Sequence, residues 1–600
     1  MVFALWCGWG FAGSGLLAAW RQGWRGRTLL VGCVLGSFAI LFSSALLLQL
    51  GTGSLGRGEW FATTVGLSLL AGLLPGRPGR NDVPETAGRP AGWLLALLVA
   101  ALCLALGVIA YRAIVQPLTG PDTIFRWDFL ARQILRQGNM GFYPQANEAD
   151  YAHYMWADGI PPLVSLLYAW SYMGGGSAAP ALTAPVVILV AVLGFMLVRM
   201  LASRVGGNSA GFWAVALLAG SALNTWSVSM GQETGVTTLG LLALAWALGS
   251  GDAEPDWRLA ALAASVAALA RDYGPALVIA GLAYLAWRKR PVRELLGFVS
   301  VTSVLVAPWY VRNWVRTGNP LFNVDLHGLF PVNRVHADMM ESYVARYGFG
   351  GHLAERVGQL LPLLWPAGAG VLVAALIATR IRGAWPAALG LLAALWLVLW
   401  LLSVGYTAGG IGYSLRVLSP FLAAASVAGG VALSKVRGSL KGLLAGLLVL
   451  VAAEASARAL VMMHVPSSER LADWGRIGSY FSAMNGTPTH DRAAAIIGSQ
   501  KVMVDDAYTH AYLVNRGVAA IPMWGTGVAF ITAPGLDMPA AMARLRAMGI
   551  TYIWLTVAPE PRGFFDRFTF FKELDPWLVP VLKGDNWVLF SLREKPAAPA

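Results

Sequence analysis

Long apolar stretches, separated by short polar ones, make up most of this chain. Many of them approach the roughly 20 apolar residues that a helix needs to cross a bilayer. The pattern predicts about 14 membrane-spanning helices, at residues 2–20, 28–50, 59–75, 91–116, 180–201, 211–230, 233–250, 257–272, 274–288, 294–311, 358–379, 385–404, 415–433 and 440–462. The first of these lacks a basic start and a good cleavage site, so we predict an anchor helix rather than a removed signal peptide.

One polar, acidic and aromatic stretch, residues 120–162, interrupts this pattern. Pro121 can begin a helix, and apolar residues follow it at helical spacing, namely Ile124, Trp127, Leu130, Ala131, Ile134 and Leu135. A second apolar helix, LVSLLYAWSYM, follows Pro162 and stops at Gly174. It is short for a span, so we predict that it lies flat at the membrane surface. If it crossed the membrane instead, every later segment would reverse its orientation.

From about residue 467 the chain takes on the character of a soluble domain. The segments KVMVDD and ITYIWLTV are typical of buried strands, and AYTHAYLVNRG and MPAAMARLRAMG of helices that end at glycine. A hairpin with its turn at residues 583–586 completes a small α/β layer. No Gly-rich phosphate loop precedes either helix, so a nucleotide site is not expected. Asp505 and Asp506 end a strand and are interpreted as caps of the next helix.

These patterns predict an α-helical polytopic membrane protein with a C-terminal extracytoplasmic α/β domain. Three regions follow along the chain. Anchor helices occupy residues 1–90, a transmembrane domain with external loops 118–179 and 312–357 occupies residues 91–462, and the α/β domain occupies residues 463–600.

Composition agrees with this fold class, because 57% of the residues are hydrophobic and only 12% are charged. The net charge of +13 does not indicate nucleic-acid binding, since much of the basic excess falls in short clusters between apolar segments. These clusters occupy every second loop, which places those loops in the cytoplasm and the polar stretch, the 312–356 loop and the tail outside. The three cysteines lie within apolar runs and show no disulfide or metal spacing.

Ionisable residues near apolar spans are costly to bury and are therefore candidates for function. Under the predicted topology the acids of the polar stretch, together with Glu233, Arg271, Arg312 and Arg416, all belong to the external side. A transferase that takes a sugar from a lipid phosphate needs such a set. A carboxylate serves as general base for the acceptor hydroxyl. Arginines or a divalent cation, Mg²⁺ or Mn²⁺, stabilise the charge on the departing phosphate.

Several motifs resemble those of one enzyme class, both in their order along the chain and in the side of the membrane on which they are predicted to lie. They are Pro121–Asp122, Ala131–Arg132 with Leu135, DGIPPL from Asp158, ARDYG from Ala270, the segment from Pro308 to Phe322, and YSLRVLSP from Tyr413. The chain resembles the GT-C class of polytopic glycosyltransferases, which use polyprenyl-phosphate-linked sugars, and is similar to the bacterial branch containing lipid A aminoarabinose transferase. The resemblance extends from about Gly92 to Leu460.

The resemblance implies an essential acid early in the first external loop, at the position of Asp122. We predict Asp122 to be the base or the group that orients the acceptor, with Asp128 as the second candidate. A cap of the following helix is the structural alternative for Asp122. Two departures from the aminoarabinose branch, Thr123 where glutamate is usual and Ile160 where lysine is usual, indicate a different donor or acceptor.

The resemblance also assigns roles to basic residues. Arg271 and Arg416 are predicted to bind the donor phosphate, and Arg312 is a further candidate. Arg312 could instead extend toward lipid headgroups, and Asp272 could simply neutralise Arg271.

The remaining candidates could bind the acceptor or a metal. Glu233 matches an acidic position at the external end of a later helix, but it could equally be a solvated helix end. Asp158 and His153 are the other acceptor or metal candidates. No spacing of His153, His327 and His336 supports a metal site, and surface histidines are commoner.

We therefore predict a glycosyltransferase at the external face of a bacterial inner membrane. It would move a sugar from a polyprenyl-phosphate-linked donor to an envelope lipid, glycan or protein by a single, inverting displacement. A transporter or flippase for a lipid-linked saccharide is the first alternative, and a non-catalytic subunit of envelope assembly is the second.

Overall fold

The computed structural model describes residues 15, 26–73, 91–120, 122–249, 254–347, 368, 370–381, 383–404, 413–461, 488–557 and 562–596. Most of the predicted span 2–20 and half of the predicted span 358–379 lie outside these residues. The chain forms two compact units. The helical unit comprises Met1–Asn139, Ile160–Tyr310 and Phe349–Val465, and the C-terminal unit comprises Met140–Gly159, Val311–Gly348 and Pro466–Ala600.

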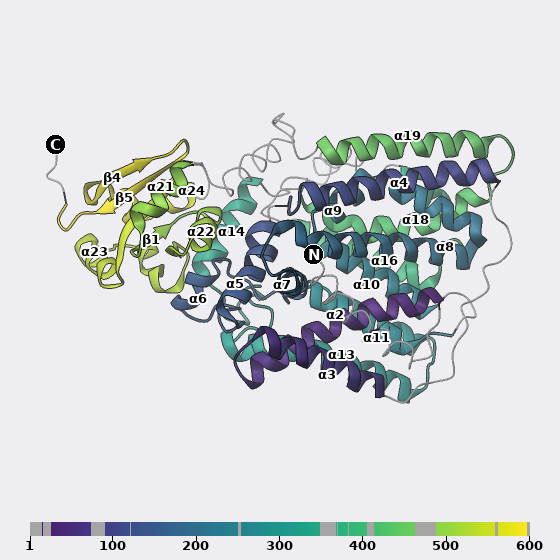
Figure 1. Cartoon of the computed structure of the whole chain (residues 1–600), viewed down its shortest axis with the longest axis horizontal. Coiled ribbons are helices and arrows are strands. Elements are labelled where there is room, and N and C mark those ends of the chain that lie inside the picture. The colour runs from purple at the N-terminus through teal and green to yellow at the C-terminus, as the bar shows by residue number, and fades with distance from the viewer. Residues whose placement is uncertain are drawn as a thin grey trace. The chain divides into compact units, whose positions relative to one another are not determined.

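The helical unit consists of helices joined by short connections (Figure 1). Its described elements are α2 (Gly26–Gly51), α3 (Arg57–Leu73), α4 (Gly92–Val115), η1 (Thr123–Asp128), α5 (Phe129–Gln137), α7 (Leu163–Gly175), η2 (Pro180–Thr183), α8 (Ala184–Ala219), α9 (Ala222–Ser229), α10 (Glu233–Leu248), α11 (Trp257–Ala270), α12 (Pro275–Trp287), most of α13 (Val292–Thr317), α16 (Ala387–Val404), η3 (Leu415–Leu418), α18 (Ser419–Ser434) and α19 (Leu440–Val461).

Seven helices among the described residues are long and apolar enough to cross a membrane. They are α2, α4, α8, α13, α16, α18 and α19. Several others, including α10, α11 and α12, are apolar but shorter. The mostly helical, polytopic character predicted from the sequence is therefore confirmed, whereas the total of about 14 spans stays a prediction.

The predicted spans 180–201 and 211–230 have different limits in the structure. The element α8 consists of two helices on either side of Gly207, whose φ of 79° favours glycine, so the break predicted between residues 201 and 211 is present. The chain then turns at Gly220, and the Ser221 hydroxyl accepts a hydrogen bond from the Asn224 N–H to begin the short helix α9. The predicted span 211–230 is thus two helical pieces.

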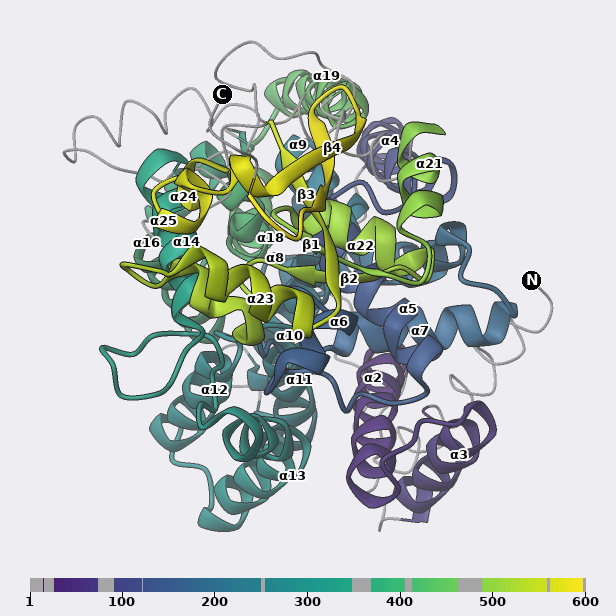
Figure 2. The same cartoon turned by 90° about the vertical axis from the view of Figure 1, so that its left-hand side faces the viewer.

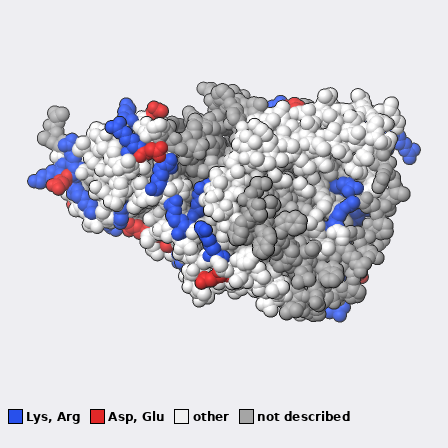
Figure 3. Space-filling model, in the orientation of Figure 1, with Lys and Arg blue, Asp and Glu red and all other residues white. Residues whose placement is uncertain are grey.

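Close packing of α8 against α18 and α4, and of α4 against α19, forms one side of the helical unit (Figure 1). Leu443, Leu447 and Leu450 are exposed on α19 at helical spacing. The face shown in Figure 3 carries few charged side chains over this unit. An apolar exterior of this kind suits contact with lipid tails.

A buried arginine fixes the end of α4. Arg112 donates hydrogen bonds to the Ala459 carbonyl on α19 (2.7 Å) and to the Thr119 hydroxyl (2.8 Å). Thr119 lies in the segment that leads to Asp122. Arg112 therefore connects two helix ends and the start of the polar stretch.

Both helices predicted in the polar stretch are present. The first begins with η1, a π-helical turn, and continues as α5, which ends at Gly138 in the left-handed conformation (φ 61°). The second is α7, which follows Pro162 and ends at Gly176 (φ 69°). The π-helical turn was not predicted.

The C-terminal unit contains a five-stranded sheet with strand order β2-β1-β3-β5-β4 (Figure 2). Its described elements are α6 (Glu148–His153), α14 (Arg334–Tyr347), α21 (Pro488–Ile497), β1 (Lys501–Val504), α22 (Ala507–Asn515), β2 (Ala519–Pro522), η4 (Thr526–Thr532), α23 (Met538–Ala547), β3 (Ile550–Thr556), α24 (Arg562–Phe565), α25 (Thr569–Lys572), η5 (Asp575–Trp577), β4 (Leu578–Lys583) and β5 (Trp587–Leu592).

The predicted strands, helices and hairpin of this unit are confirmed, and β2 is an additional strand. Strands β1, β2 and β3 pair in parallel, while β5 and β4 form the antiparallel hairpin. The Asp506 side chain caps α22, as predicted, by accepting from the Thr509 N–H (2.7 Å). Asp505 does not cap that helix. Its carboxylate accepts instead from the N–H and hydroxyl of Thr556 at the end of β3.

Residues from three separate stretches of sequence hold the C-terminal unit together. Burial lowers the pKa of His510 to about 3, so its imidazole is neutral and its Nε2 donates to the Tyr151 carbonyl (3.0 Å). The Trp524 indole donates to the Met155 carbonyl (2.5 Å). Asn333 donates to both the Tyr151 hydroxyl and the Trp524 carbonyl. The segments 140–159 and 311–348 are therefore integral parts of this unit.

Candidate active site

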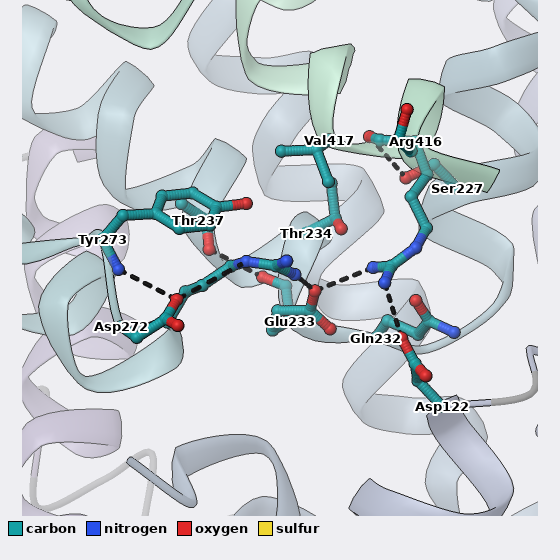
Figure 4. Close-up of polar contacts among 12 residues, drawn as sticks. Asp122, Ser227, Gln232, Glu233, Thr234, Thr237, Asp272, Tyr273, Arg416 and Val417 are labelled. Atoms are coloured by element: carbon teal, nitrogen blue, oxygen red, sulfur yellow. Dashed lines mark hydrogen bonds and ion pairs between the residues drawn. The ribbon is translucent and has the colours of Figure 1, made fainter. Parts of the chain in front are cut away.

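Five charged residues from four parts of the sequence form a connected cluster in the helical unit (Figure 4). We call Asp122, Glu233, Arg271, Asp272 and Arg416 the charged cluster. Asp122 and Arg416 are almost 300 residues apart along the chain. The structure thus brings together four of the residues predicted from the sequence, together with Asp272.

Asp122 lies at the start of η1 and has helical backbone angles (φ −57°, ψ −28°). Its side chain makes no capping hydrogen bond, so the interpretation of Asp122 as a helix cap is wrong. The carboxylate instead accepts from Arg416 Nη2 at 2.5 Å. The Thr123 hydroxyl holds the first turn by donating to the Met230 carbonyl (2.9 Å).

Glu233 is the first residue of α10 and lies directly after a tight turn. Gly231 has φ +68°, and a Cβ at that position would lie 2.4 Å from the Tyr168 hydroxyl, so only glycine suits the turn. The Glu233 side chain is 1% exposed, which excludes the alternative of a solvated helix end. Its carboxylate accepts from the Trp127 indole (3.0 Å) and from Arg416 Nη1 (2.8 Å). The positive end of the helix dipole favours a carboxylate here.

Arg271 follows the last residue of α11 with an extended backbone (φ −154°, ψ 150°). Its Nη1 pairs with Glu233 Oε1. The contact of its Nε with Asp272 is much longer, 3.9 Å, so Asp272 is not its main counter-ion. The guanidinium lies 4.6 Å from the centre of the Tyr273 ring. Arg271 is 19% exposed and Asp272 is 34% exposed, so this end of the charged cluster is open to solvent or ligand.

Arg416 lies in η3, just before α18, and connects the two carboxylates. Its guanidinium lies 4.3 Å from the centre of the Tyr413 ring. The Tyr413 hydroxyl in turn accepts from the Gln232 amide (2.8 Å) and, more weakly, from the Asp122 N–H (3.4 Å). The Arg416 side chain is 6% exposed, compared with 15% for Asp122.

The charges of Asp122, Glu233, Arg271 and Arg416 cancel formally. Burial alone would raise the pKa of Asp122, but the positive charges of Arg416, Arg126 and Arg271 outweigh burial and hold that pKa below its ordinary value. Asp122 is therefore ionised at neutral pH. A buried, fully ionised set of this kind is costly unless each charge is paired, and here each one is.

Asp128, the second candidate for the base, belongs to a different cluster. Its carboxylate accepts from the Tyr172 hydroxyl and from Arg132 Nε (2.7 Å). Burial raises the pKa of Asp128 more than Arg132 and Tyr172 lower it. This cluster connects η1 and α5 to α7.

Three predicted site residues belong to the C-terminal unit. Arg312 is buried and donates to the Met140 carbonyl (2.7 Å), so it does not extend toward lipid headgroups. Asp158 accepts from the Tyr143 hydroxyl (2.6 Å) and is also close to the Tyr154 hydroxyl (3.5 Å). His153 packs on Phe142, with 5.7 Å between ring centres, and burial lowers the pKa of its imidazole.

The side chains of the candidate site do not favour the binding of a metal ion. Within the described part of the chain, no three His, Cys, Asp or Glu side chains are grouped so that they could hold one. Asp122 and Glu233 supply the two carboxylates of the charged cluster, and the guanidinium of Arg416 lies between them. A divalent cation would need to displace that guanidinium to reach both carboxylates.

Sequence reasoning missed two parts of the charged cluster's surroundings. Trp127 was assigned to the apolar stripe of its helix, yet its indole N–H bonds Glu233. Tyr413 appeared only as the first residue of the Arg416 motif. Its spacing of three residues before Arg416, typical of one helical turn, was the available signal.

The fold can be compared with solved structures, although no family model and no curated protein sequence matches the chain. The apo structure of ArnT from Cupriavidus metallidurans superposes with a TM-score of 0.55 at 15% identity, covering 85% of this chain and 99% of that chain. The structure of the same protein bound to undecaprenyl phosphate gives a TM-score of 0.53 at 14% identity, covering 85% and 100%. The chain has a GT-C-like fold.

The predicted resemblance is thereby confirmed at the level of the fold. The apo form of the Archaeoglobus fulgidus oligosaccharyltransferase superposes less well, with a TM-score of 0.45 at 12% identity over 79% of this chain and 71% of that chain. Together with the seven membrane-length helices, the GT-C-like fold describes an integral, multi-pass membrane protein.

Proposed function

We propose that this protein is a glycosyltransferase that takes a sugar from a polyprenyl-phosphate-linked donor. The observation that carries this proposal is the charged cluster. It combines one partly accessible carboxylate, Asp122, with the guanidinium groups of Arg271 and Arg416, in a fold shared with a protein that was crystallised with undecaprenyl phosphate.

In the proposed reaction Asp122 accepts the proton of the acceptor hydroxyl. The acceptor oxygen attacks the anomeric carbon of the sugar while the bond from that carbon to the phosphate oxygen breaks. The electron pair of the broken bond stays on the departing polyprenyl phosphate. A single displacement of this kind inverts the anomeric centre.

Arg271 and Arg416 stabilise the charge that develops on the departing phosphate. Planar guanidinium groups suit this role because they offer phosphate oxygens two donors in a fixed geometry. We assign the role to arginines rather than to Mg²⁺ or Mn²⁺ because Arg416 already occupies the position between the two carboxylates.

The proposed setting is the external face of a bacterial inner membrane, with an envelope lipid, glycan or protein as acceptor. The basic clusters in every second loop support this orientation. A prenyl tail can remain in the bilayer while its phosphate reaches arginines at the ends of the helices.

Replacement of Asp122 tests the proposal. In the purified full chain, Asp122→Asn is expected to lower the release of undecaprenyl phosphate from undecaprenyl-phosphate-linked sugars about 10²–10⁴-fold, because the amide cannot accept the proton. The assay offers a panel of such sugars, with cell-envelope fractions as acceptor.

Asp585→Asn makes the same chemical change at an exposed carboxylate in the β4–β5 turn and should retain full activity. Full activity of Asp122→Asn would rule out Asp122 as the base. Movement of a lipid-linked saccharide across the bilayer, without release of undecaprenyl phosphate, would support the transporter alternative instead.

A further inference from the structure

The two hydrogen bonds between Arg416 and carboxylates differ in how accessible they are. Nη1 bonds Glu233, whose side chain is 1% exposed, at 2.8 Å. Nη2 bonds Asp122, whose side chain is 15% exposed, at 2.5 Å. The bond to Asp122 is therefore the more accessible of the two.

Glu233 is an anchor for its neighbours. One carboxylate oxygen, Oε1, accepts from both Arg416 and Arg271, and the other, Oε2, accepts from the Trp127 indole. Donors from three separate segments thus hold a single buried carboxylate, and Figure 4 shows the guanidinium of Arg416 at Glu233. Breaking any of these bonds would leave a buried charge poorly compensated, so Glu233 is expected to keep both arginines when a ligand arrives.

Asp122 is poorly suited to act as a base while it is bound to Arg416. The positive charges around it hold the pKa of its carboxyl low, against the effect of burial. A carboxylate with a low pKa is a weak proton acceptor, and its Oδ2 is already occupied by Arg416 Nη2. The hydrogen bond from Arg416 therefore makes the Asp122 carboxylate less available as the base of the proposed reaction.

An anionic phosphate would change this balance. It brings negative charge next to Asp122, which repels it, and it offers Arg416 several acceptor oxygens. Nη1 and Nη2 of Arg416 are each already bonded to a carboxylate, so a phosphate that binds one of these nitrogens competes with a carboxylate for it. Asp122 is the more exposed of the two and is held by fewer hydrogen bonds.

We propose that Arg416 exchanges partners when the donor binds. Its Nη2 passes from Asp122 to the donor phosphate, while its Nη1 remains on Glu233, which acts as a positioning residue. Asp122 is thereby released to receive the acceptor proton only when donor is present. This inference rests on the proposed function and adds to it a binding order, donor before acceptor.

Infrared difference spectroscopy of the full chain in detergent tests the exchange without a transfer assay. The probe is undecaprenyl phosphate, and undecaprenol, which lacks the phosphate, is the control ligand. Addition of undecaprenyl phosphate is expected to shift a carboxylate stretching band, because one carboxylate loses its guanidinium partner. The shift should be lost in Asp122→Asn and kept in Asp585→Asn.

Two further variants test the roles of Arg416 and Glu233. Arg416→Lys keeps the positive charge but loses the two terminal nitrogens of the guanidinium. It should abolish the carboxylate band shift that depends on Asp122. Glu233→Gln should shrink the band at saturating probe, since Arg416 then has Asp122 as its sole carboxylate partner within the charged cluster. A full-sized band in Glu233→Gln would leave Glu233 a purely structural role and overturn its assignment as positioning residue.

The outcomes separate this inference from the proposed function. If undecaprenyl phosphate binds but produces no band that depends on both Asp122 and Arg416, the partner exchange is wrong and the proposed function stands. If undecaprenyl phosphate does not bind at all, the proposed function itself is contradicted.

Discussion

The carboxylate of Asp122 is subject to two opposing influences, burial and the nearby guanidinium groups. Burial favours the neutral acid, whereas Arg416, Arg126 and Arg271 favour the anion and prevail. The same arginine that keeps Asp122 ionised also occupies its oxygen. Chemistry at this residue therefore depends on what else binds Arg416.

The low pKa of Asp122 sets the expected pH dependence. A base is lost when it is protonated, so activity should fall only as pH drops through this lowered pKa. We expect the acid limb that Asp122 gives to kcat/KM, which reports the enzyme without bound donor, to lie below the ordinary pKa of an aspartate.

The acid limb of kcat should lie at higher pH than that of kcat/KM, because the bound donor removes Arg416 from Asp122 and the pKa rises. Steady-state rates measured from pH 4 to pH 8 check this difference, because kcat should fall toward the acid end of the range while kcat/KM shows no fall from Asp122. Coincident limbs would argue against the release of Asp122 in the donor complex.

Arg271 provides a second test at the level of a single residue. Arg271→Gln should raise the KM for the donor about 10–100-fold, the equivalent of roughly 1.5–3 kcal/mol for a lost charge-assisted hydrogen bond. Arg271→Lys should be intermediate, since it retains the charge without the planar fork.

Arg334→Gln is the matched control, because it removes an exposed arginine from a surface ion pair with Asp325. Its donor KM should not change. An unchanged donor KM in Arg271→Gln would remove Arg271 from the phosphate site.

Among the structural elements, the turn between α9 and α10 leads directly to Glu233 of the charged cluster. Gly231→Ala requires an alanine at φ +68°, with its Cβ 2.4 Å from the Tyr168 hydroxyl. We expect a loss of about 1–2 kcal/mol of stability, because L-residues disfavour this backbone region. We also expect lower transfer activity, since Glu233 follows two residues later.

Thermal unfolding of the detergent-solubilised chain and the transfer assay measure these two effects. Gly107→Ala is the control, because Gly107 lies within α4 and a Cβ there meets no atom within 4 Å. That substitution should lower neither property, since alanine favours the helix more than glycine does. Wild-type behaviour of Gly231→Ala would show that the turn tolerates a side chain.

Local patterns predicted many elements correctly but not the deviations from regular structure. The run from Ile124 to Leu135 predicted a helix, yet the π-helical geometry of residues 123–128 has no signature in apolar spacing. The break at Gly207, by contrast, falls in the connection predicted between the spans 180–201 and 211–230. Strand β2 has only four residues and ends in proline, so it shows no periodicity.

For the charged cluster, sequence indicated the members but not their connections. Glu233, Arg271 and Arg416 were candidates because charges are rare near apolar spans. That Glu233 Oε1 accepts from both arginines depends on the packing of α10, α11 and η3, which lie far apart in sequence. The hydrogen bond from Trp127 could not be predicted either, since an indole on an apolar stripe is usually just packed.

At the scale of the whole molecule, the distribution of charge predicts the membrane orientation. The connection between α18 and α19, with Lys435, Arg437 and, in the first turn of α19, Lys441, is expected in the cytoplasm, whereas the β4–β5 hairpin is expected outside. In a cysteine-free background, an impermeant maleimide should label Asp585→Cys in intact cells. It should label Ser439→Cys only after permeabilisation.

Ser439 and Asp585 are both exposed, so a difference in labelling reports the side of the membrane rather than burial. Labelling of Ser439→Cys alone in intact cells would reverse the predicted topology. It would also move the proposed reaction to the cytoplasmic face.

The composite origin of the C-terminal unit has a practical consequence for protein engineering. Tyr151 and Met155 from one stretch and Asn333 from another complete the hydrogen bonds of His510 and Trp524. Grafting the tail alone onto a homologous scaffold would separate these bonded partners. Chimeras that exchange this unit should therefore carry residues 140–159, 311–348 and 466–600 together.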